Sequence, residues 1–163
     1  MQLLSFKEDD FSLLYDFMKP IWLETYTDVI PREQILFLLD KYFSEEGIAA
    51  YRAKGYCYYK LLDGALCGVV VICQKDGCTY LDKLYLLPAS RGRGYAAFVF
   101  GELLKLGRDV LLNVNQGNAR AVACYKKNGF VIEREEHIPL DDGMVNVDYV
   151  MRLTRTAFDS SKK

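Results

Sequence analysis

The stretch from Leu84 to Ala96 constrains the fold of this chain more than any other, because an apolar run stops at a proline and a glycine-spaced basic turn follows. The bulky residues before Pro88 have the β-prone character of a buried strand, and proline removes a backbone donor where strand pairing should end. Apolar residues after Gly94 recur at helical spacing. We therefore expect a strand, a turn at Gly92 and Gly94, and a helix whose first N–H groups suit an anion such as phosphate.

The basic turn reads Arg91-Gly92-Arg93-Gly94-Tyr95-Ala96, and a second motif follows at 111–130. The second motif combines a strand, an Asn-initiated helix, a tyrosine and a Gly-Phe ending. In residues, order and spacing, the two motifs resemble those of the GNAT superfamily of acetyl-CoA-dependent N-acetyltransferases. The turn matches neither the P-loop, which ends in Gly-Lys-Ser/Thr, nor the dinucleotide fingerprint, which needs a third glycine.

Length and composition favour one globular domain. At 163 residues and 51% apolar composition, the chain is long enough for one buried core and short for two. We expect a single domain over residues 1–157 and a frayed polar tail at 158–163. The 21 Lys and Arg nearly balance the 22 Asp and Glu, so no nucleic-acid or anionic-lipid partner is expected. The N-terminal sequence, the lack of a long apolar run and the five unpatterned cysteines predict a cytoplasmic protein without a membrane span.

The periodicity and turn residues predict the elements in chain order. A strand is expected at 2–6, then a helical face that Pro20 kinks or interrupts, so that two helical pieces join there, and a helix from Pro31 to about Gly47. The rest reads as strands at 56–62, 66–73 and 78–87, a helix at 92–106, a strand at 109–114, a helix at 118–128 and strands at 130–137 and 145–153.

The expected fold class is α+β. Consecutive strands from 56 to 87 form an antiparallel meander, and the strand-helix-strand order after residue 78 implies a parallel, right-handed crossover. The result is a mixed, mostly antiparallel sheet of about seven strands with helices on both faces. The GNAT resemblance adds that the parallel fourth and fifth strands splay apart, and that the pantetheine arm of the cofactor lies between them like an added strand.

The resemblance assigns acetyl-CoA as the acetyl donor. Its implied cofactor-binding residues are Leu84, Leu86, Arg91, Gly92, Arg93, Gly94, Tyr95, Ala96, Asn118 and Tyr125. Backbone N–H groups of the turn hold the pyrophosphate, and the two arginines either add charge beside it or face solvent. The backbone N–H of Leu86 polarises the thioester carbonyl, since one aligned donor to a developing oxyanion can contribute about 3 kcal/mol.

The resemblance places Tyr125 at the general-acid position of the family. A thiol has a pKa of about 8.5 and a phenol about 10, so a tyrosine can protonate a departing thiolate without strong perturbation. The alternative for one of 12 tyrosines is a packed aromatic ring. Asn118, seven residues earlier, suits a helix N-cap and a position near the pantetheine.

The general base is left open among several carboxylates. In histone-type and arylalkylamine-type relatives the base lies four or two residues before the position matched to Leu84, which are Tyr80 and Asp82 here. Asp82 is charged within an apolar strand, so it is either a site residue or a strand residue that faces solvent or pairs with Lys83 or another cation. Glu24 and Asp148 are further candidates, and the single histidine, His137, is expected at the surface.

The acceptor pocket of this family is built from the N-terminal helices and the last hairpin. The expected acceptor-binding residues are Trp22, Glu24, Tyr26, Tyr80 and Asp148, with Tyr42, Asp141 and Asp142 nearby, a set that suits a cationic amine. A polyamine-like molecule, an amino-sugar antibiotic, a protein N-terminus and a lysine all stay possible, and so does a non-catalytic acetyl-CoA-binding domain. No metal site is expected from one histidine, and the sequence leaves the oligomeric state open.

Overall fold

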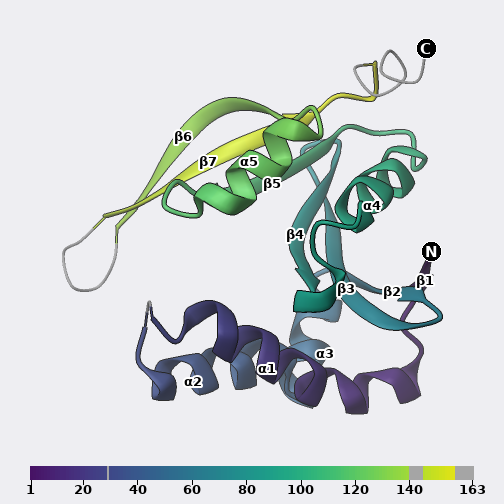
Figure 1. Ribbon diagram of the computed structural model, residues 1–163, viewed down its shortest axis with the longest axis vertical. Coiled ribbons are helices and arrows are strands. Elements are labelled where there is room, and N and C mark those ends of the chain that lie inside the picture. Colours follow the sequence, from purple (N-terminus) through teal and green to yellow (C-terminus); the bar gives the residue numbers. More distant parts are fainter. Residues whose placement is uncertain (29, 140–144, 157–163) are drawn as a thin grey trace. The chain divides into compact units, whose positions relative to one another are not determined.

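The computed structural model describes residues 1–28, 30–139 and 145–156. The tail expected at 158–163 and the acceptor candidates Asp141 and Asp142 lie outside these residues. Figure 1 shows the elements in chain order. The strands are β1 Gln2–Ser5, β2 Cys57–Asp63, β3 Ala65–Lys75, β4 Cys78–Leu86, β5 Val110–Asn115, β6 Val131–Pro139 and β7 Val145–Leu153. The helices are η1 Glu8–Leu13, α1 Leu14–Tyr26, α2 Arg32–Phe43, α3 Glu45–Ala53, η2 Pro88–Ser90, α4 Tyr95–Leu104 and α5 Ala119–Lys127, of which η1 and η2 are 3₁₀ turns.

The strands form a seven-stranded mixed sheet with the order β1-β2-β3-β4-β5-β7-β6. β4 and β5 run parallel, with Thr79 beside Val110 and Tyr80 beside Leu111. The β1–β2, β5–β7 and β6–β7 pairs are antiparallel. The mixed sheet and its parallel β4–β5 pair confirm the expected fold class, whereas the splay of that pair stays a prediction.

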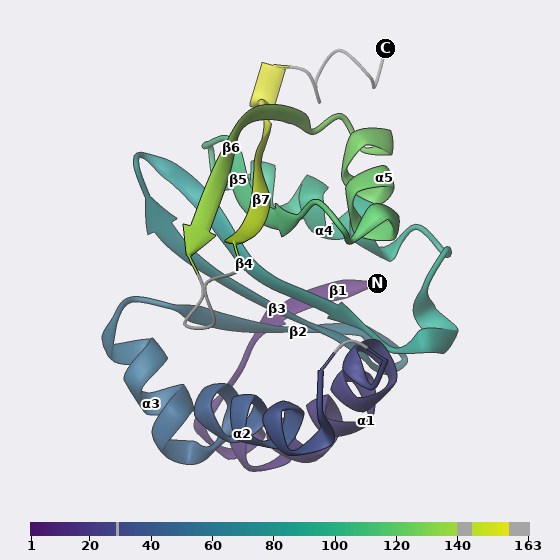
Figure 2. The same cartoon turned by 90° about the vertical axis from the view of Figure 1, so that its left-hand side faces the viewer.

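The chain divides into two compact units. The N-terminal unit comprises Met1–Val71 and Lys83–Tyr95, and the C-terminal unit comprises Ile72–Asp82 and Ala96–Lys163. In the N-terminal unit, α1, α2 and α3 lie together beside β2 (Figure 2). Their apolar faces pack with the inner residues of β2 and β3 into one core. Its fully buried members include Met18, Ile35, Leu39, Val69 and Val71.

The helical joint expected near Pro20 is wrong, because α1 continues through this residue. The change of helix type lies instead between Leu13 and Leu14, where η1 passes into α1. Pro20 is exposed, whereas the opposite face of α1 is buried through Met18, Ile21 and other residues. Burial of large apolar side chains contributes about 2 kcal/mol each, so the buried residues of α1 together outweigh the roughly 3 kcal/mol cost of an interior proline.

The helix expected to run to Gly47 ends earlier, and the sequence interpretation missed α3. Ser44 ends α2 and caps α3, since its side-chain oxygen accepts from the N–H of Gly47 at 3.1 Å. Gly47 lies inside α3 and is buried. A Cβ atom there would lie 2.3 Å from the backbone oxygen of Lys41, so glycine permits the close approach of two helices rather than ending one.

In the C-terminal unit, α5 lies between the two capping residues that the sequence predicts. Asn118 is the N-cap, and its side-chain oxygen accepts from the N–H of Ala121 at 3.1 Å. Gly129 follows the helix with φ of +90°, and a Cβ atom there would lie 3.3 Å from the Leu153 side chain. Both predictions are confirmed, and they fix the ends of the helix that carries Tyr125.

Candidate active site

The glycine turn, residues 91–95, joins η2 to α4 and belongs to the N-terminal unit. Gly92 and Gly94 have φ values of +72° and +83°, and a Cβ atom at either would meet no atom within 4 Å. Among the described residues, the N–H groups of Gly92, Arg93 and Gly94 have no hydrogen-bond partner. Successive unpaired N–H groups in such a turn attract anions, so this backbone fits a pyrophosphate.

The first residue of the glycine turn is bound to α1. Nη1 and Nη2 of Arg91 donate to Oε1 and Oε2 of Glu24 at 3.0 and 2.9 Å. The side chain of Arg91 is 25% exposed and that of Glu24 is 47% exposed. The structure thus pairs a residue predicted to bind pyrophosphate with one predicted to bind the acceptor, a contact that sequence spacing does not reveal.

The last residue of the glycine turn is bound to the β2–β3 connection. The hydroxyl of Tyr95, a residue that is 4% exposed, donates to Oδ2 of Asp63 at 2.7 Å. The guanidinium of Arg93 lies 5.5 Å from the centre of the Tyr95 ring. The hydrogen bond is the main cause that lowers the pKa of Asp63 and raises the pKa of Tyr95. The buried Tyr95 side chain therefore anchors the turn to Asp63, and only the backbone of Tyr95 is available for a ligand.

The backbone of Leu86 points its N–H group away from β3. The next N–H, that of Leu87, donates to the carbonyl of Cys67 on β3 at 2.9 Å. Successive N–H groups of a strand point to opposite edges, so the N–H of Leu86 points to the other edge of β4. The side chains of Leu84 and Leu86 are half-buried. This direction agrees with the predicted role of the Leu86 N–H at a thioester carbonyl, which stays a prediction.

The three α1 residues predicted for the acceptor differ in exposure. Trp22 is 5% exposed, and its ring centre lies 5.1 Å from that of Tyr26 and 5.9 Å from that of Tyr85. The hydroxyls of Tyr26 and Tyr85 are 3.4 Å apart. Nε1 of Trp22 is buried without a hydrogen-bond partner in the described residues. Trp22 is thus largely a core residue, whereas Glu24 and Tyr26 reach the surface of α1.

Lys83 contacts two aromatic rings, which the sequence interpretation did not predict. Its Nζ lies 4.6 Å from the ring centre of Tyr42 and 5.1 Å from that of Tyr51. A cation over two aromatic faces is a stabilising arrangement. One of the tyrosines expected near the acceptor, Tyr42, therefore binds an ammonium group of the chain itself.

Tyr125 lies on α5 in the C-terminal unit and is half-buried. Its ring packs against Phe130 and Phe100, with centres 5.4 and 6.0 Å away. The N–H of Phe130 also donates to the carbonyl oxygen of Tyr125 at 3.1 Å. Packing on two rings fixes the side chain, and half-exposure leaves part of it accessible, as a proton donor requires.

Residues of four strands in the C-terminal unit form a polar strand face. Directly opposed residues of paired strands share one face of a sheet, as do alternate residues of a strand. By this rule the registers place one set of polar side chains together: Tyr80, Asn113, Asn115, Arg134, Glu136, Asn146, Asp148 and Arg152. The Tyr80 hydroxyl donates to Asn113 at 3.4 Å, and Asn113 donates to Glu136 at 2.7 Å. The alternating polar residues Asn113 and Asn115 in the sequence Leu-Leu-Asn-Val-Asn could have indicated this face in advance.

Asp148 has an unusual charge environment on the polar strand face. Nδ2 of Asn146 donates to its carboxylate at 3.0 Å, and Glu136 lies directly opposite on β6. Burial is the main cause that raises the pKa of Asp148, and the charge of Glu136 adds to it. Arg134 donates to Glu136 at 2.6 Å, which together with Asn113 lowers the pKa of that carboxyl. The structure therefore brings the predicted residues Tyr80 and Asp148 onto one face.

Asp82 ends the part of β4 that belongs to the C-terminal unit and is half-buried. Side chains alternate along a strand, so Asp82 shares the face of Tyr80. Ala96 follows Tyr95 in the first turn of α4 and is also half-buried. The choice of Asp82 as base stays a prediction.

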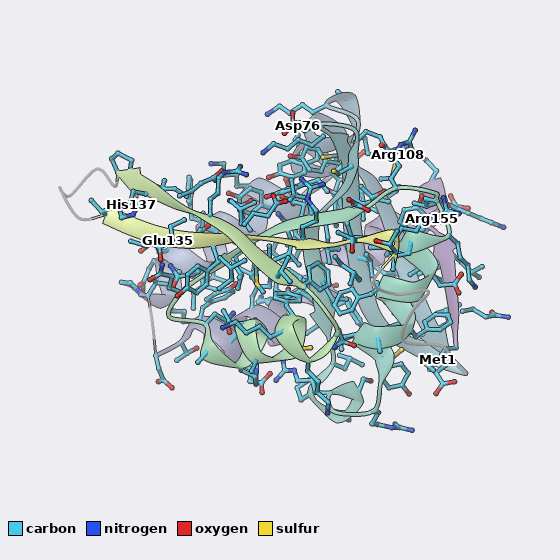
Figure 3. The ribbon with its side chains drawn as sticks, turned by 90° about the horizontal axis from the view of Figure 1, so that it is seen from above. Met1, Asp76, Arg108, Glu135, His137 and Arg155 are labelled. Carbon is cyan, nitrogen blue, oxygen red and sulfur yellow. The ribbon has the colours of Figure 1, made fainter. Side chains whose placement is uncertain are left out.

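His137 lies beside Glu135 toward the hairpin end of β6 (Figure 3). Its side chain is 64% exposed, and Nε2 lies 3.7 Å from Oε2 of Glu135. This exposure confirms the expected surface position. Across residues 1–28, 30–139 and 145–156, no group of three or more His, Cys, Asp or Glu side chains is placed to hold a metal ion. In the same part of the chain, every helix is too short or too polar to cross a membrane.

Comparison with known proteins agrees with this geometry. Uncharacterized N-acetyltransferases of Mycobacterium tuberculosis and Mycobacterium bovis are 38% identical to the chain over 95 residues, which cover 55% of the chain and 60% of each relative. The aligned segment thus spans less than two thirds of the length of these relatives.

Two solved structures share the fold. The PaiA N-acetyltransferase of Thermoplasma acidophilum, in complex with coenzyme A, aligns with a TM-score of 0.69 at 20% identity over 94% of this chain and 98% of its own. The spermidine N-acetyltransferase of Vibrio cholerae, in complex with coenzyme A and spermine, aligns with a TM-score of 0.67 at 17% identity over 96% of both chains.

The family assignment rests on a match over most of the chain. The family model described as Acetyltransferase (GNAT) family matches residues 13–130, a range that contains α1, the glycine turn, Asn118 and Tyr125. The chain therefore belongs to the GNAT family of acetyltransferases.

Proposed function

We propose that this chain transfers the acetyl group of acetyl-CoA directly to a primary amine of a small molecule or peptide. The observation that carries the proposal is the backbone of the glycine turn. Gly92 and Gly94 hold it open through positive φ angles, and three successive N–H groups lack partners among the described residues. Such a backbone suits the pyrophosphate of coenzyme A. Membership of the GNAT family also supports coenzyme A as the ligand.

The pyrophosphate would bind to backbone N–H groups from Gly92 to Ala96. Arg93 would add positive charge beside it, since its side chain is exposed. Arg91 is already paired with Glu24, so its field at the pyrophosphate is partly offset. Binding should therefore depend more on the backbone than on the arginine side chains.

Acetyl-CoA would supply the thioester. The N–H of Leu86 would donate to the thioester oxygen as negative charge develops there, and Leu84 would line the same strand. The C–N bond to the amine forms and the C–S bond breaks. Tyr125 would give its proton to the departing thiolate, so that coenzyme A leaves as the thiol. The packed, half-exposed ring of Tyr125 supports this role.

The amine must lose protons during the reaction. An alkylammonium has a pKa of about 10.4, so a base must accept a proton from it at neutral pH. We assign this role to Asp82, directly or through water. Asp82 shares a strand face with Tyr80 in the C-terminal unit, and Tyr80 begins the polar strand face.

The polar strand face supports a cationic acceptor. Asp148 is bound by the amide of Asn146, and no described cation pairs with it, so negative charge is left over beside Glu136. An ammonium group would offset that charge. We propose that Tyr80 and Asp148 contact the acceptor.

The cysteines support a cytoplasmic location. All five are free thiols, as expected in a reducing compartment.

The experiment that tests the proposed function measures release of the free thiol from acetyl-CoA. A panel should contain polyamines, amino sugars, lysine-containing peptides and peptides with free N-termini, each over a range of pH. We expect amine-dependent thiol release with at least one class. If coenzyme A binds but no amine supports turnover, the chain is an acetyl-CoA-binding module instead.

A further inference from the structure

The glycine turn is held at both ends by carboxylates from other parts of the N-terminal unit. Glu24 of α1 binds Arg91 through two hydrogen bonds of 3.0 and 2.9 Å. Asp63, at the end of β2, binds the hydroxyl of Tyr95 at 2.7 Å. We propose that Glu24 and Asp63 are positioning residues for coenzyme A, which fix the two ends of the turn so that its N–H groups point to the pyrophosphate. The inference rests on the proposed function.

The Arg91 end has the geometry of a fixed attachment. A guanidinium that donates two parallel N–H bonds to both oxygens of one carboxylate has little orientational freedom. Two contacts with Tyr85 on β4 reinforce this end, because Trp22 and Tyr26 lie on the same stretch of α1 as Glu24. The ring of Trp22 contacts the ring of Tyr85, and the hydroxyls of Tyr26 and Tyr85 lie within hydrogen-bond distance. The end of α1 and the strand that leads into the turn are therefore joined at several points.

The Tyr95 end is fixed by a buried side chain. Tyr95 is 4% exposed, and its one hydroxyl is used for the bond to Asp63. Arg93 lies over the ring of Tyr95, at 5.5 Å from its centre. The low pKa of Asp63 keeps that carboxylate ionised as an acceptor over the neutral pH range.

Between the two ends, the space around both glycines of the turn is open. Gly92 and Gly94 meet no atom within 4 Å of a Cβ position, and the N–H groups of residues 92–94 are unpaired there. A turn with two glycines has many accessible conformations, so fixing its ends reduces the entropy lost when a ligand orders it.

The direction in which coenzyme A affinity changes when Glu24 loses its charge separates the positioning role from simple electrostatic repulsion. A carboxylate close to a pyrophosphate repels it, so removal of the Glu24 charge alone would tighten binding. Loss of an attachment that orders the turn would weaken binding instead. The two roles therefore predict opposite changes in the dissociation constant of coenzyme A.

The test is a titration of the full chain with coenzyme A by calorimetry. The variants are Glu24→Gln, which keeps the size of the side chain, and Tyr95→Phe, which leaves the net charge unchanged. Glu8→Gln is the matched control, because Glu8 also pairs with an arginine, Arg52, at 2.8 Å. We expect Glu24→Gln and Tyr95→Phe each to weaken coenzyme A binding about fivefold, as loss of a contact of about 1 kcal/mol predicts, and Glu8→Gln to bind like the wild type.

Steady-state kinetics separates positioning from acceptor binding. For Glu24→Gln we expect KM for acetyl-CoA to rise and KM for the amine to stay the same. A rise in the amine KM alone, or unchanged or tighter coenzyme A binding in both variants, would overturn the inference. The unfolding temperature of each variant is measured as well. If Glu8→Gln lowers the unfolding temperature and the affinity for coenzyme A as much as the two variants do, the loss of affinity reflects general destabilisation and the inference also fails.

The wild-type titration keeps this test distinct from that of the proposed function. If wild-type protein does not bind coenzyme A, the proposed function fails and the inference fails with it. If wild-type protein binds coenzyme A and the two variants bind it equally well, only the positioning role of Glu24 and Asp63 fails.

Discussion

Asp148 and Glu136 lie directly opposite each other on the antiparallel strands β7 and β6. Like charges at directly opposed positions destabilise a sheet. Arg134 binds Glu136, whereas Asp148 has the amide of Asn146. The chain therefore keeps a partly buried carboxylate that costs folding stability, at a position that we assign to the acceptor amine.

Asp148→Asn should separate stability from activity. Because the pKa of Asp148 is raised in the folded state, that state binds more protons than the unfolded state between the two pKa values. Wild-type stability should thus fall as pH rises from the ordinary carboxyl pKa through the raised one, and the variant should lack this fall. Unfolding midpoints over pH 3 to 8 should show a variant more stable near pH 7.

The same Asp148→Asn variant should lose activity toward a cationic amine. We expect kcat/KM for the amine to fall about tenfold, since one charge interaction of roughly 1.4 kcal/mol is removed. An unchanged kcat/KM together with a higher unfolding midpoint would show that Asp148 does not bind the acceptor.

Gly94→Glu should abolish stabilisation by acetyl-CoA. The new side chain meets no atom near its Cβ, so the loss would come from its charge and from strain at φ of +83°. Gly107→Glu is the control, because Gly107 has φ of +82° and equally open space. Thermal unfolding with and without acetyl-CoA should show a ligand-induced shift in Gly107→Glu and none in Gly94→Glu. Equal shifts would contradict the assignment of the glycine turn to pyrophosphate.

Asp82→Asn should lower the rate most at neutral pH. If Asp82 accepts the proton of the ammonium, higher pH supplies more neutral amine and the variant should partly recover. A profile of kcat/KM against pH up to about 9.5, below the amine pKa of about 10.4, would show this recovery. A loss of the same size at every pH would indicate that Asp82 positions the acceptor or supports the fold.

Tyr125→Phe should lower turnover by about a hundredfold while coenzyme A affinity stays close to wild type. The ring contacts with Phe100 and Phe130 are kept, so the unfolding free energy should change by about 1 kcal/mol at most. Single-turnover rates, calorimetry and denaturant unfolding on this variant measure the three quantities. Near-normal turnover with a measurable stability loss would make Tyr125 a packing residue.

Local signals in the sequence predicted most of the fold. Asn118 and Gly129 act at the ends of their own helix, so both roles can be predicted from the local sequence without knowledge of tertiary contacts. Pro20 and Gly47 misled for the opposite reason. The buried face of α1 carries the helix past Pro20, and the backbone of α2 requires glycine at position 47 inside α3.

The site divides in the same way. The glycine turn and Tyr125 belong to short motifs with fixed spacing, so the sequence alone picks them out. The polar strand face depends on a strand order in which β7 lies between β5 and β6, and no local pattern specifies that order. The bonds from Glu24 to Arg91 and from Asp63 to Tyr95 join residues 67 and 32 positions apart, which only the folded chain reveals.

The transfer of a labelled acetyl group tests the central claim most directly. Protein, acetyl-CoA labelled in the acetyl group and each amine of the panel would be mixed, and the label would be traced in acetyl-CoA, protein and amine over time. With at least one amine, direct transfer predicts that the label moves from acetyl-CoA to the amine nitrogen, in amounts equal to the thiol released, with none bound covalently to the protein at any time. Label that stays on acetyl-CoA with every amine, or that first accumulates in a covalent bond to the protein, would contradict the account.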